Sequence, residues 1–81
     1  MNLRNFKQGD KLDILVPSEV FIIEMCDEYV VIESNMSMTE IRPNGTMSLL
    51  NTFKQIKINK GEIKKITLAC TDYKDSVMLT Y

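Results

Sequence analysis

The chain has 81 residues, of which 44% are hydrophobic and 26% are charged, and its formal net charge is −1. This length allows one small domain without a second core, and this composition excludes a disordered chain. Two cysteines are too few for a disulfide framework, and no apolar run approaches the roughly 20 residues of a membrane span. We therefore predict one domain over residues 1–81 that stays in the cytoplasm, with no signal peptide and no membrane contact.

The first alternating segment follows Gly9. In residues 10–16, DKLDILV, the apolar residues Leu12, Ile14 and Val16 share one face, as expected of a strand. With its Gly-Asp turn, the stretch FKQGDKLDIL resembles the first strand of SH3-like barrels over about ten residues. This resemblance implies a small barrel and no particular activity.

The next two segments predict a hairpin around a tight corner at Asp27–Glu28. Residues 19–25, EVFIIEM, are apolar on both faces, and residues 29–34, YVVIES, alternate. We expect Met25 to pair with Val30 and Ile23 with Ile32. The shared core face then carries Phe21, Ile23, Met25, Val30 and Ile32.

The segment EIRPNGTMSL, residues 40–49, contains the clearest turn. Proline has no N–H for a ladder, so a three-residue loop fits better than a two-residue turn: Pro43 and Asn44 form a type I turn, and Gly45 takes the left-handed position. This loop pairs Ile41 with Met47 and Thr39 with Leu49. The alternative is a short helix over 46–54, capped by Thr46.

Residues 53–71 predict a second hairpin with its tip at Lys60–Gly61. Ile56, Ile58 and Ile63 fit one face, but Ile66, Leu68 and Cys70 are out of phase with Ile63. A bulge at Lys64–Lys65 would restore the phase and turn both lysines outward. In the last strand, residues 76–81, the face towards the core carries Val77, Leu79 and Tyr81.

Six to seven short strands joined by tight turns predict an all-β domain. The expected architecture is a small antiparallel, SH3-like barrel or a rolled meander, in which the segment 46–54 is a strand or one short helix. Closure of the sheet would also remove edge strands that promote aggregation.

Catalysis is poorly supported by the residue types present. The chain has no histidine, so Cys26 and Cys70 lack the usual activating base, and two cysteines are too few for a structural zinc site. Three glycines, each at a predicted turn, form no phosphate-binding loop. We therefore predict a protein that is not an enzyme, with no cofactor and no metal.

Charge is segregated along the chain. Between Asp13 and Glu40 every charged residue is acidic, whereas the stretch from Arg42 to Lys74 is mostly basic. Three interpretations remain open: cross-strand ion pairs, a basic surface for nucleic acid, and an acidic surface for a basic protein partner.

Two candidate surfaces follow. For nucleic acid, the basic hairpin would place Lys57 opposite Lys64–Lys65 beside a stacking aromatic, although the isoelectric point of about 5.3 is unusually low for such a domain. That site comprises Phe53, Lys57, Lys60, Lys64 and Lys65. For a protein partner, the flexible apolar side chains of Met36, Met38 and Leu50 would lie together on the first hairpin.

Leu3 and Phe6 would cover this methionine patch in the alternative case, and an exposed patch would also permit a homodimer. Our preferred interpretation is a non-catalytic binding protein that acts through protein–protein interaction, of the small accessory or inhibitor type found in bacteria and phages. The alternative is a small barrel that binds nucleic acid through residues 53–65.

Overall fold

A computed structural model describes the backbone of residues 1–14, 19–45, 47–68 and 75–81, and the side chains of the same residues apart from 47–52. These residues form one 3-10 helix and six strands. The elements are η1 (Leu3–Asn5), β1 (Lys11–Leu12), β2 (Val20–Met25), β3 (Tyr29–Ile41), β4 (Met47–Asn59), β5 (Ile63–Leu68) and β6 (Val77–Thr80).

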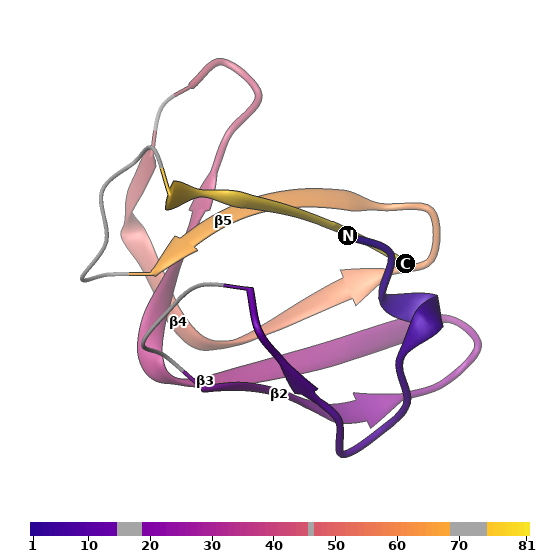
Figure 1. Cartoon of the computed structure of the whole chain (residues 1–81). Helices are drawn as coiled ribbons and strands as arrows, with labels where there is room; N and C mark the ends of the chain where they lie inside the picture. Colours follow the sequence, from indigo (N-terminus) through magenta and orange to yellow (C-terminus); the bar gives the residue numbers. More distant parts are fainter. Residues whose placement is uncertain (15–18, 46, 69–74) are drawn as a thin grey trace.

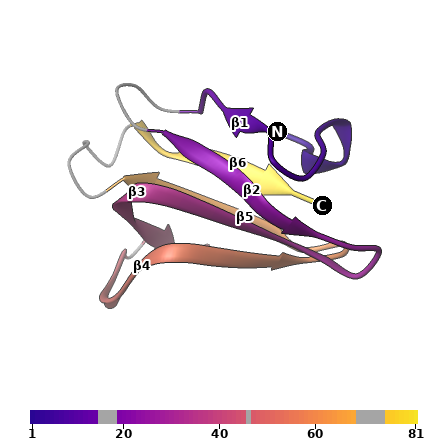
Figure 2. The same ribbon diagram turned by 90° about the horizontal axis from the view of Figure 1, so that it is seen from below.

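The strands form one antiparallel sheet that curls into a half-barrel (Figure 1). Their order is β1-β2-β3-β5-β6, and β4 pairs with β3 outside this path. Seen from below, β4 and β1 lie at opposite sides of the curled sheet (Figure 2). The prediction of a small, all-β antiparallel fold is therefore confirmed.

The long strand β3 organises the sheet because it pairs with three others. Its first part pairs with β2 and with the second part of β4, and its last part pairs with β5 and with the start of β4. The register with β4 shifts between Glu33 and Met38. Such an irregularity bends a strand, which lets β3 serve both parts of the half-barrel.

The three-residue loop at Pro43-Asn44-Gly45 forms as predicted. The Gly45 N–H donates to the Arg42 carbonyl at 2.9 Å, and Gly45 has a φ of 87°. Ile41 pairs with Met47, but Thr39 pairs with Thr52 and not with Leu49, because the register shifts between Thr39 and Ile41. Since β4 begins at Met47, the alternative of a helix over 46–54 is wrong.

The hairpin of β2 and β3 forms with a register different from the predicted one. Met25 pairs with Val30 as expected, but Ile22, not Ile23, pairs with Ile32. A bulge between Ile22 and Glu24 reverses the phase, so Ile23 is 37% exposed. Because β2 is apolar on both faces, its sequence alone did not distinguish the two registers.

The second predicted hairpin is wrong. The turn at Lys60–Gly61 exists, with the Glu62 N–H donating to the Asn59 carbonyl at 2.9 Å, but β4 pairs with β3, and β5 pairs with β3 and β6. The register of β5 with β6 runs without a shift from Ile63 to Ile66, so no bulge restores the phase of Ile63. Ile63 is simply exposed.

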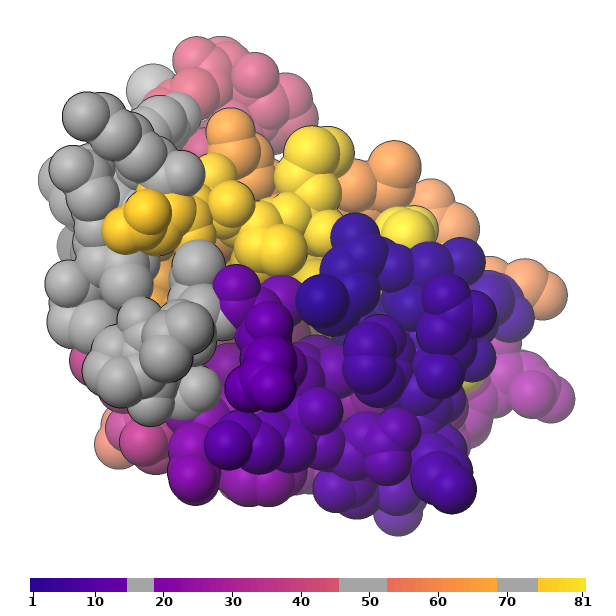
Figure 3. Space-filling model, viewed as in Figure 1, coloured from indigo at the N-terminus to yellow at the C-terminus, as the bar shows by residue number. Residues whose placement is uncertain are grey.

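The N-terminal segment spans the distance between β6 and β2. The Thr80 N–H donates to the Met1 carbonyl at 3.0 Å, and Asn2 forms a parallel bridge with Thr80. Further along, the Gly9 N–H donates to the Ile22 carbonyl at 2.7 Å. Figure 3 shows this segment in indigo against yellow β6. Of the strand predicted over 10–16, β1 covers Lys11–Leu12, and residues 15–18 lie outside the described part.

A single core fills the half-barrel, and Leu3 at its closed side has no exposed surface. The last strand faces this core as predicted, since Leu79 and Tyr81 are buried and Val77 packs against them. The core comprises Leu3, Leu12, Val20, Ile22, Val30, Ile32, Met38, Ile56, Ile58, Ile66, Leu68, Leu79 and Tyr81.

Candidate binding surface

An ion pair lies on the inner side of the sheet at its open edge. Lys64 Nζ is 3.1 Å from Glu40 Oε1 and 3.2 Å from Glu62 Oε1. Lys64 pairs across strands with buried Leu79, and Glu40 with buried Ile66, so both charged side chains project from the core-facing side. The Glu62 contact is electrostatic, because its buried Oε1 accepts no well-directed hydrogen bond.

The surroundings of Lys64 change the pKa of its ammonium group in two directions. Partial burial lowers the pKa, whereas the hydrogen bond to Glu40 and the contact with Glu62 raise it. The carboxylates outweigh burial, so the pKa of Lys64 lies above its ordinary value of 10.5. Lys64 is therefore a cation at neutral pH whose charge is already balanced from within the chain.

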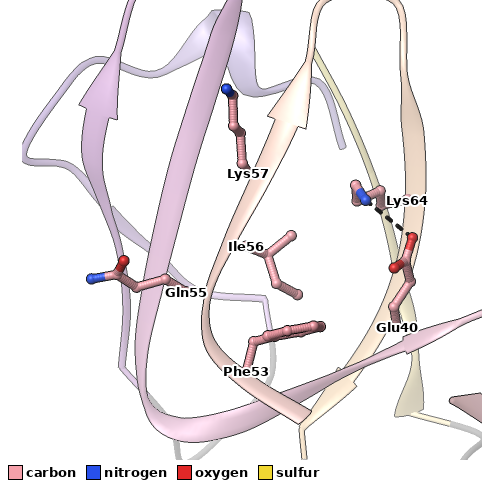
Figure 4. Close-up of a pocket in the computed structure, with 6 residues that line it drawn as sticks. All are labelled: Glu40, Phe53, Gln55, Ile56, Lys57 and Lys64. Atoms are coloured by element: carbon pink, nitrogen blue, oxygen red, sulfur yellow. Dashed lines mark hydrogen bonds and ion pairs between the residues drawn. The ribbon is translucent and has the colours of Figure 1, made fainter. Parts of the chain in front are cut away.

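A hollow of about 210 Å³ lies on one side of this ion pair, between β4 and β5 (Figure 4). Phe53 and Ile56 extend from β4 towards Glu40 and Lys64, and Phe53 is 42% exposed. We call this space the β4–β5 hollow. Its lining comprises Glu40, Phe53, Gln55, Ile56, Lys57 and Lys64.

A larger hollow of about 540 Å³ lies on the other side, next to the β3–β4 loop. Ile63 and Met78 project into it from β5 and β6 and are 63% and 55% exposed. We call this space the loop hollow. Its lining comprises Glu40, Ile41, Arg42, Pro43, Gly45, Ile63, Lys64, Lys65 and Met78.

The residues predicted to bind nucleic acid are only partly brought together. Phe53, Lys57 and Lys64 line the β4–β5 hollow, Lys65 lines the loop hollow, and Lys60 lies at the turn outside both linings. The predicted opposition of Lys57 to Lys64–Lys65 is wrong, because Lys57 pairs with Val31. Its ammonium lies 4.3 Å from the centre of the Tyr29 ring, a cation–π contact.

The residues predicted to contact a protein partner do not form the expected exposed patch. Met38 has no exposed surface and belongs to the core, and Met36 is half-buried against it. The side chain of Leu50 lies outside the described part. Met38 keeps the inward phase of Val30 and Ile32 along β3 and pairs with buried Leu68 on β5. Leu3 and Phe6 pack on the same core.

Sequence reasoning missed the two most exposed apolar side chains of the described residues, Ile63 and Met78. The signal for Ile63 was present, since it is out of phase with Ile66 and Leu68. A bulge was inferred to bring it inside, whereas an exposed isoleucine was the simpler solution. Met78 alternates with buried Leu79, so its exposure could be read from the last strand.

The acidic and basic parts of the sequence meet in the structure. Glu40 belongs to the acidic stretch and Lys64 to the basic one, and they pair across β3 and β5. Neutral Gln55, which lies within the basic stretch, also donates from Nε2 on β4 to Glu33 Oε1 on β3, at 2.9 Å. Strands β4 and β5 both flank β3, so the charges interleave there.

Potential metal ligands are not grouped in the described part of the chain, where no three acidic or cysteine side chains are placed to hold a metal ion. Cys26 is a half-buried free thiol whose Sγ lies 3.6 Å from Glu28 Oε2, and Cys70 lies outside the described part. No helix in residues 1–14, 19–45, 47–68 or 75–81 has the length and apolarity to cross a membrane.

Comparison of the chain with models of protein families, with curated proteins and with solved structures finds no significant match. The function must therefore be argued from the surface itself.

Proposed function

We propose that this chain is a non-catalytic binding protein that contacts a protein partner through the loop hollow. The observation that carries the proposal is the exposure of Ile63 and Met78, 63% and 55%, in one concave lining. They lie on the same face of adjacent strands, because Ile63 pairs with Thr80 and the next residue on that face, Lys65, pairs with Met78.

The chemistry of this hollow suits recognition of a protein surface. Apolar Ile41 and Pro43 adjoin the two exposed side chains, and charged residues surround them. An apolar centre with a polar rim is the usual composition of a protein interface. The flexible thioether of Met78 can adapt to the shape of a partner.

The proposal predicts that Ile63→Asp removes partner binding without unfolding the protein, since the side chain contributes little to the core. Ile23→Asp is the matched control, because Ile23 is also an exposed isoleucine, on β2. The measurement is affinity capture from cells of the source organism, with quantitative comparison of the proteins retained by each variant. Sedimentation of the purified chain tests a second copy as the partner.

A partner lost with Ile63→Asp and with Met78→Asp but retained with Ile23→Asp is the expected result. A set of retained proteins that is identical for all variants, with a monomeric chain in each case, would contradict the proposal. Circular dichroism of each variant separates loss of binding from loss of folding.

Nucleic acid is the second candidate, because Phe53 and Lys57 share the β4–β5 hollow. Stacking on Phe53 and backbone contacts from Lys57 and Lys60 would suit a single strand. Against it, Glu40 lies in the same lining and Lys64 is balanced by two carboxylates. Retention of labelled oligothymidine at low salt, weakened by Lys57→Glu, would favour this candidate.

A cytoplasmic location, a bacterial or phage origin and an SH3-like character belong to the same proposal. They rest on the residue composition and on the resemblance of residues 6–15 to the first strand of SH3-like barrels.

A further inference from the structure

We propose a second interaction surface, the outer edge of β4, which pairs with an extended acidic segment of another protein. This inference goes beyond the proposed function because it names a separate surface, the kind of segment that binds and the mode of binding. Throughout the described residues, β4 has one strand neighbour, β3, and its other edge faces the β4–β5 hollow.

The backbone groups available at this edge follow from the hydrogen-bond pattern. The Lys60 N–H donates to the Glu28 carbonyl at 2.8 Å, so this pair is hydrogen-bonded. Antiparallel ladders alternate between bonded and non-bonded pairs, so in the continuous register from Tyr29 to Glu33 the bonds to β3 come from Ile58 and Ile56.

Gln55 and Lys57 therefore direct their N–H and C=O groups away from β3. The pairing of β2 supports the same assignment. The backbone of Ile22 bonds to residues 9 and 10, so the backbone groups of Phe21 point to β3 and pair with those of Glu33. Because Glu33 directs its backbone groups towards β2, its partner on β4, Gln55, directs its own away from β3. Two outward pairs of donors and acceptors, separated by about 7 Å, are the template that an added strand requires.

The charge at this edge indicates that the added segment is acidic. Residues 53–60, FKQIKINK, contain three lysines and no acid. Of the two nearest carboxylates, Glu40 is balanced by Lys64, whereas Glu33 keeps its charge and accepts a hydrogen bond from neutral Gln55. An acidic segment is therefore attracted, whereas a second copy paired through β4 would oppose its lysines to those of the first.

The β4–β5 hollow adds a place for a side chain. Phe53 and Ile56 supply an apolar wall beside the edge, so one apolar residue of the added strand can enter while its acidic neighbours face the lysines. A nucleic acid strand would use the lysines and Phe53, but it has no regular row of amides to pair with Gln55 and Lys57.

The probe for this inference is a synthetic peptide of about ten residues with alternating Glu and Val, the length of a long strand. Amide hydrogen exchange of the whole chain is followed by NMR. We expect the amides of Gln55 and Lys57 to exchange more slowly with peptide, by about tenfold or more, because paired amides exchange only on opening. Amides of Ile56 and Ile58, already bonded to β3, should change little.

Three controls separate strand pairing from charge alone. The same peptide with alternate backbone nitrogens methylated keeps its charge but loses the donors, and it should not protect these amides. Gln55→Pro removes one outward N–H without touching the ladder to β3, and it should weaken binding more than Gln55→Ala, which loses the same side chain but keeps the N–H. Lys54→Glu should weaken binding, and Lys7→Glu, an equal charge change at an exposed site elsewhere, should not.

The inference is overturned if the methylated peptide binds equally well, if oligothymidine binds and the peptide does not, or if protection of Gln55 rises with protein concentration alone. No protection by the peptide would overturn it too. The loop hollow is tested separately by Ile63→Asp, so failure of this surface leaves the proposed function standing, and the reverse also holds.

Discussion

The curled sheet leaves two gaps between its strands, and only one of them is covered by the rest of the chain. Between β6 and β2, residues 1–12 cover the gap, Leu3 is fully buried and Tyr81 is nearly so. Between β4 and β5, by contrast, the gap is lined by the Glu40–Lys64 ion pair and by half-exposed Phe53. The first side is closed by apolar contact and holds the fold together, and the second stays open to solvent and presents a surface.

Tyr81 shows how the closed side is fastened. Its hydroxyl donates to the Cys26 carbonyl at the β2–β3 turn, and its own carbonyl accepts from the Gly61 N–H at 2.9 Å. The guanidinium of Arg4 lies 4.7 Å from the centre of its ring. Tyr81 thus connects two turns and the N-terminal segment through its hydroxyl, its carbonyl and its ring.

The contrast between the two sides predicts the largest loss of stability for Leu3→Ala. Truncation of a fully buried leucine should lower the free energy of unfolding by about 3 kcal/mol, through lost burial and the cavity left behind. Phe53→Ala on the open side should cost about 1 kcal/mol or less, because its side chain is half-exposed. Urea unfolding followed by circular dichroism measures both, and equal losses would show that the two sides do not differ.

Tyr81→Phe should have an intermediate effect. The ring and its contact with Arg4 remain, but the partly buried Cys26 carbonyl loses its donor, at a cost of about 1 kcal/mol. Tyr29→Phe is the control, because Tyr29 bonds to exposed Glu24 at 2.9 Å. The same urea titration measures the two variants, and a loss for Tyr29→Phe as large as that for Tyr81→Phe would argue against a special role of the closed side.

Glu40→Gln should have the smallest effect on the free energy of unfolding, about 1 kcal/mol or less, since the pair is partly exposed. The stabilisation by this ion pair also depends on pH. The pKa of Lys64 is raised in the folded chain, so the stabilisation is fully present below the ordinary value of 10.5 and is lost as pH rises through the folded value.

The difference in unfolding free energy between the parent chain and Glu40→Gln should therefore shrink between neutral pH and strongly alkaline pH. Urea titrations at each pH measure this difference. Lys64→Met serves as the control, because in that background the Glu40→Gln change should show no such dependence. A difference that persists unchanged at alkaline pH would show that Glu40 acts through packing alone.

Local patterns predicted the turns better than the strand partners. The loop at Pro43-Asn44-Gly45 was predicted because proline lacks an N–H and glycine tolerates positive φ, and both causes act within a few residues. The partner of β5 was predicted wrongly, because the Lys60–Gly61 turn fixes only the reversal of the chain and not which strand lies beside it afterwards.

The candidate site was likewise predicted from the sequence only in part. Phe53, Lys57 and Lys64 were identified from their residue types, and the structure does place them around one hollow. The methionine patch is not exposed, because Met38 keeps the inward phase of Val30 and Ile32 along β3. The strand that buries Met38 is β5, through Leu68, and the sequence around the methionines does not identify that distant partner.

The sequence by itself determined that this chain forms antiparallel strands around one small core, because alternation of apolar residues and the chemistry of turns act over a few neighbours. The tertiary structure alone decided which face of each bulged strand is buried and, within the described residues, that β4 keeps an unpaired edge. Those outcomes depend on which parts of β3 pair with β2, β4 and β5. These segments compete for β3 although they lie far apart in the chain.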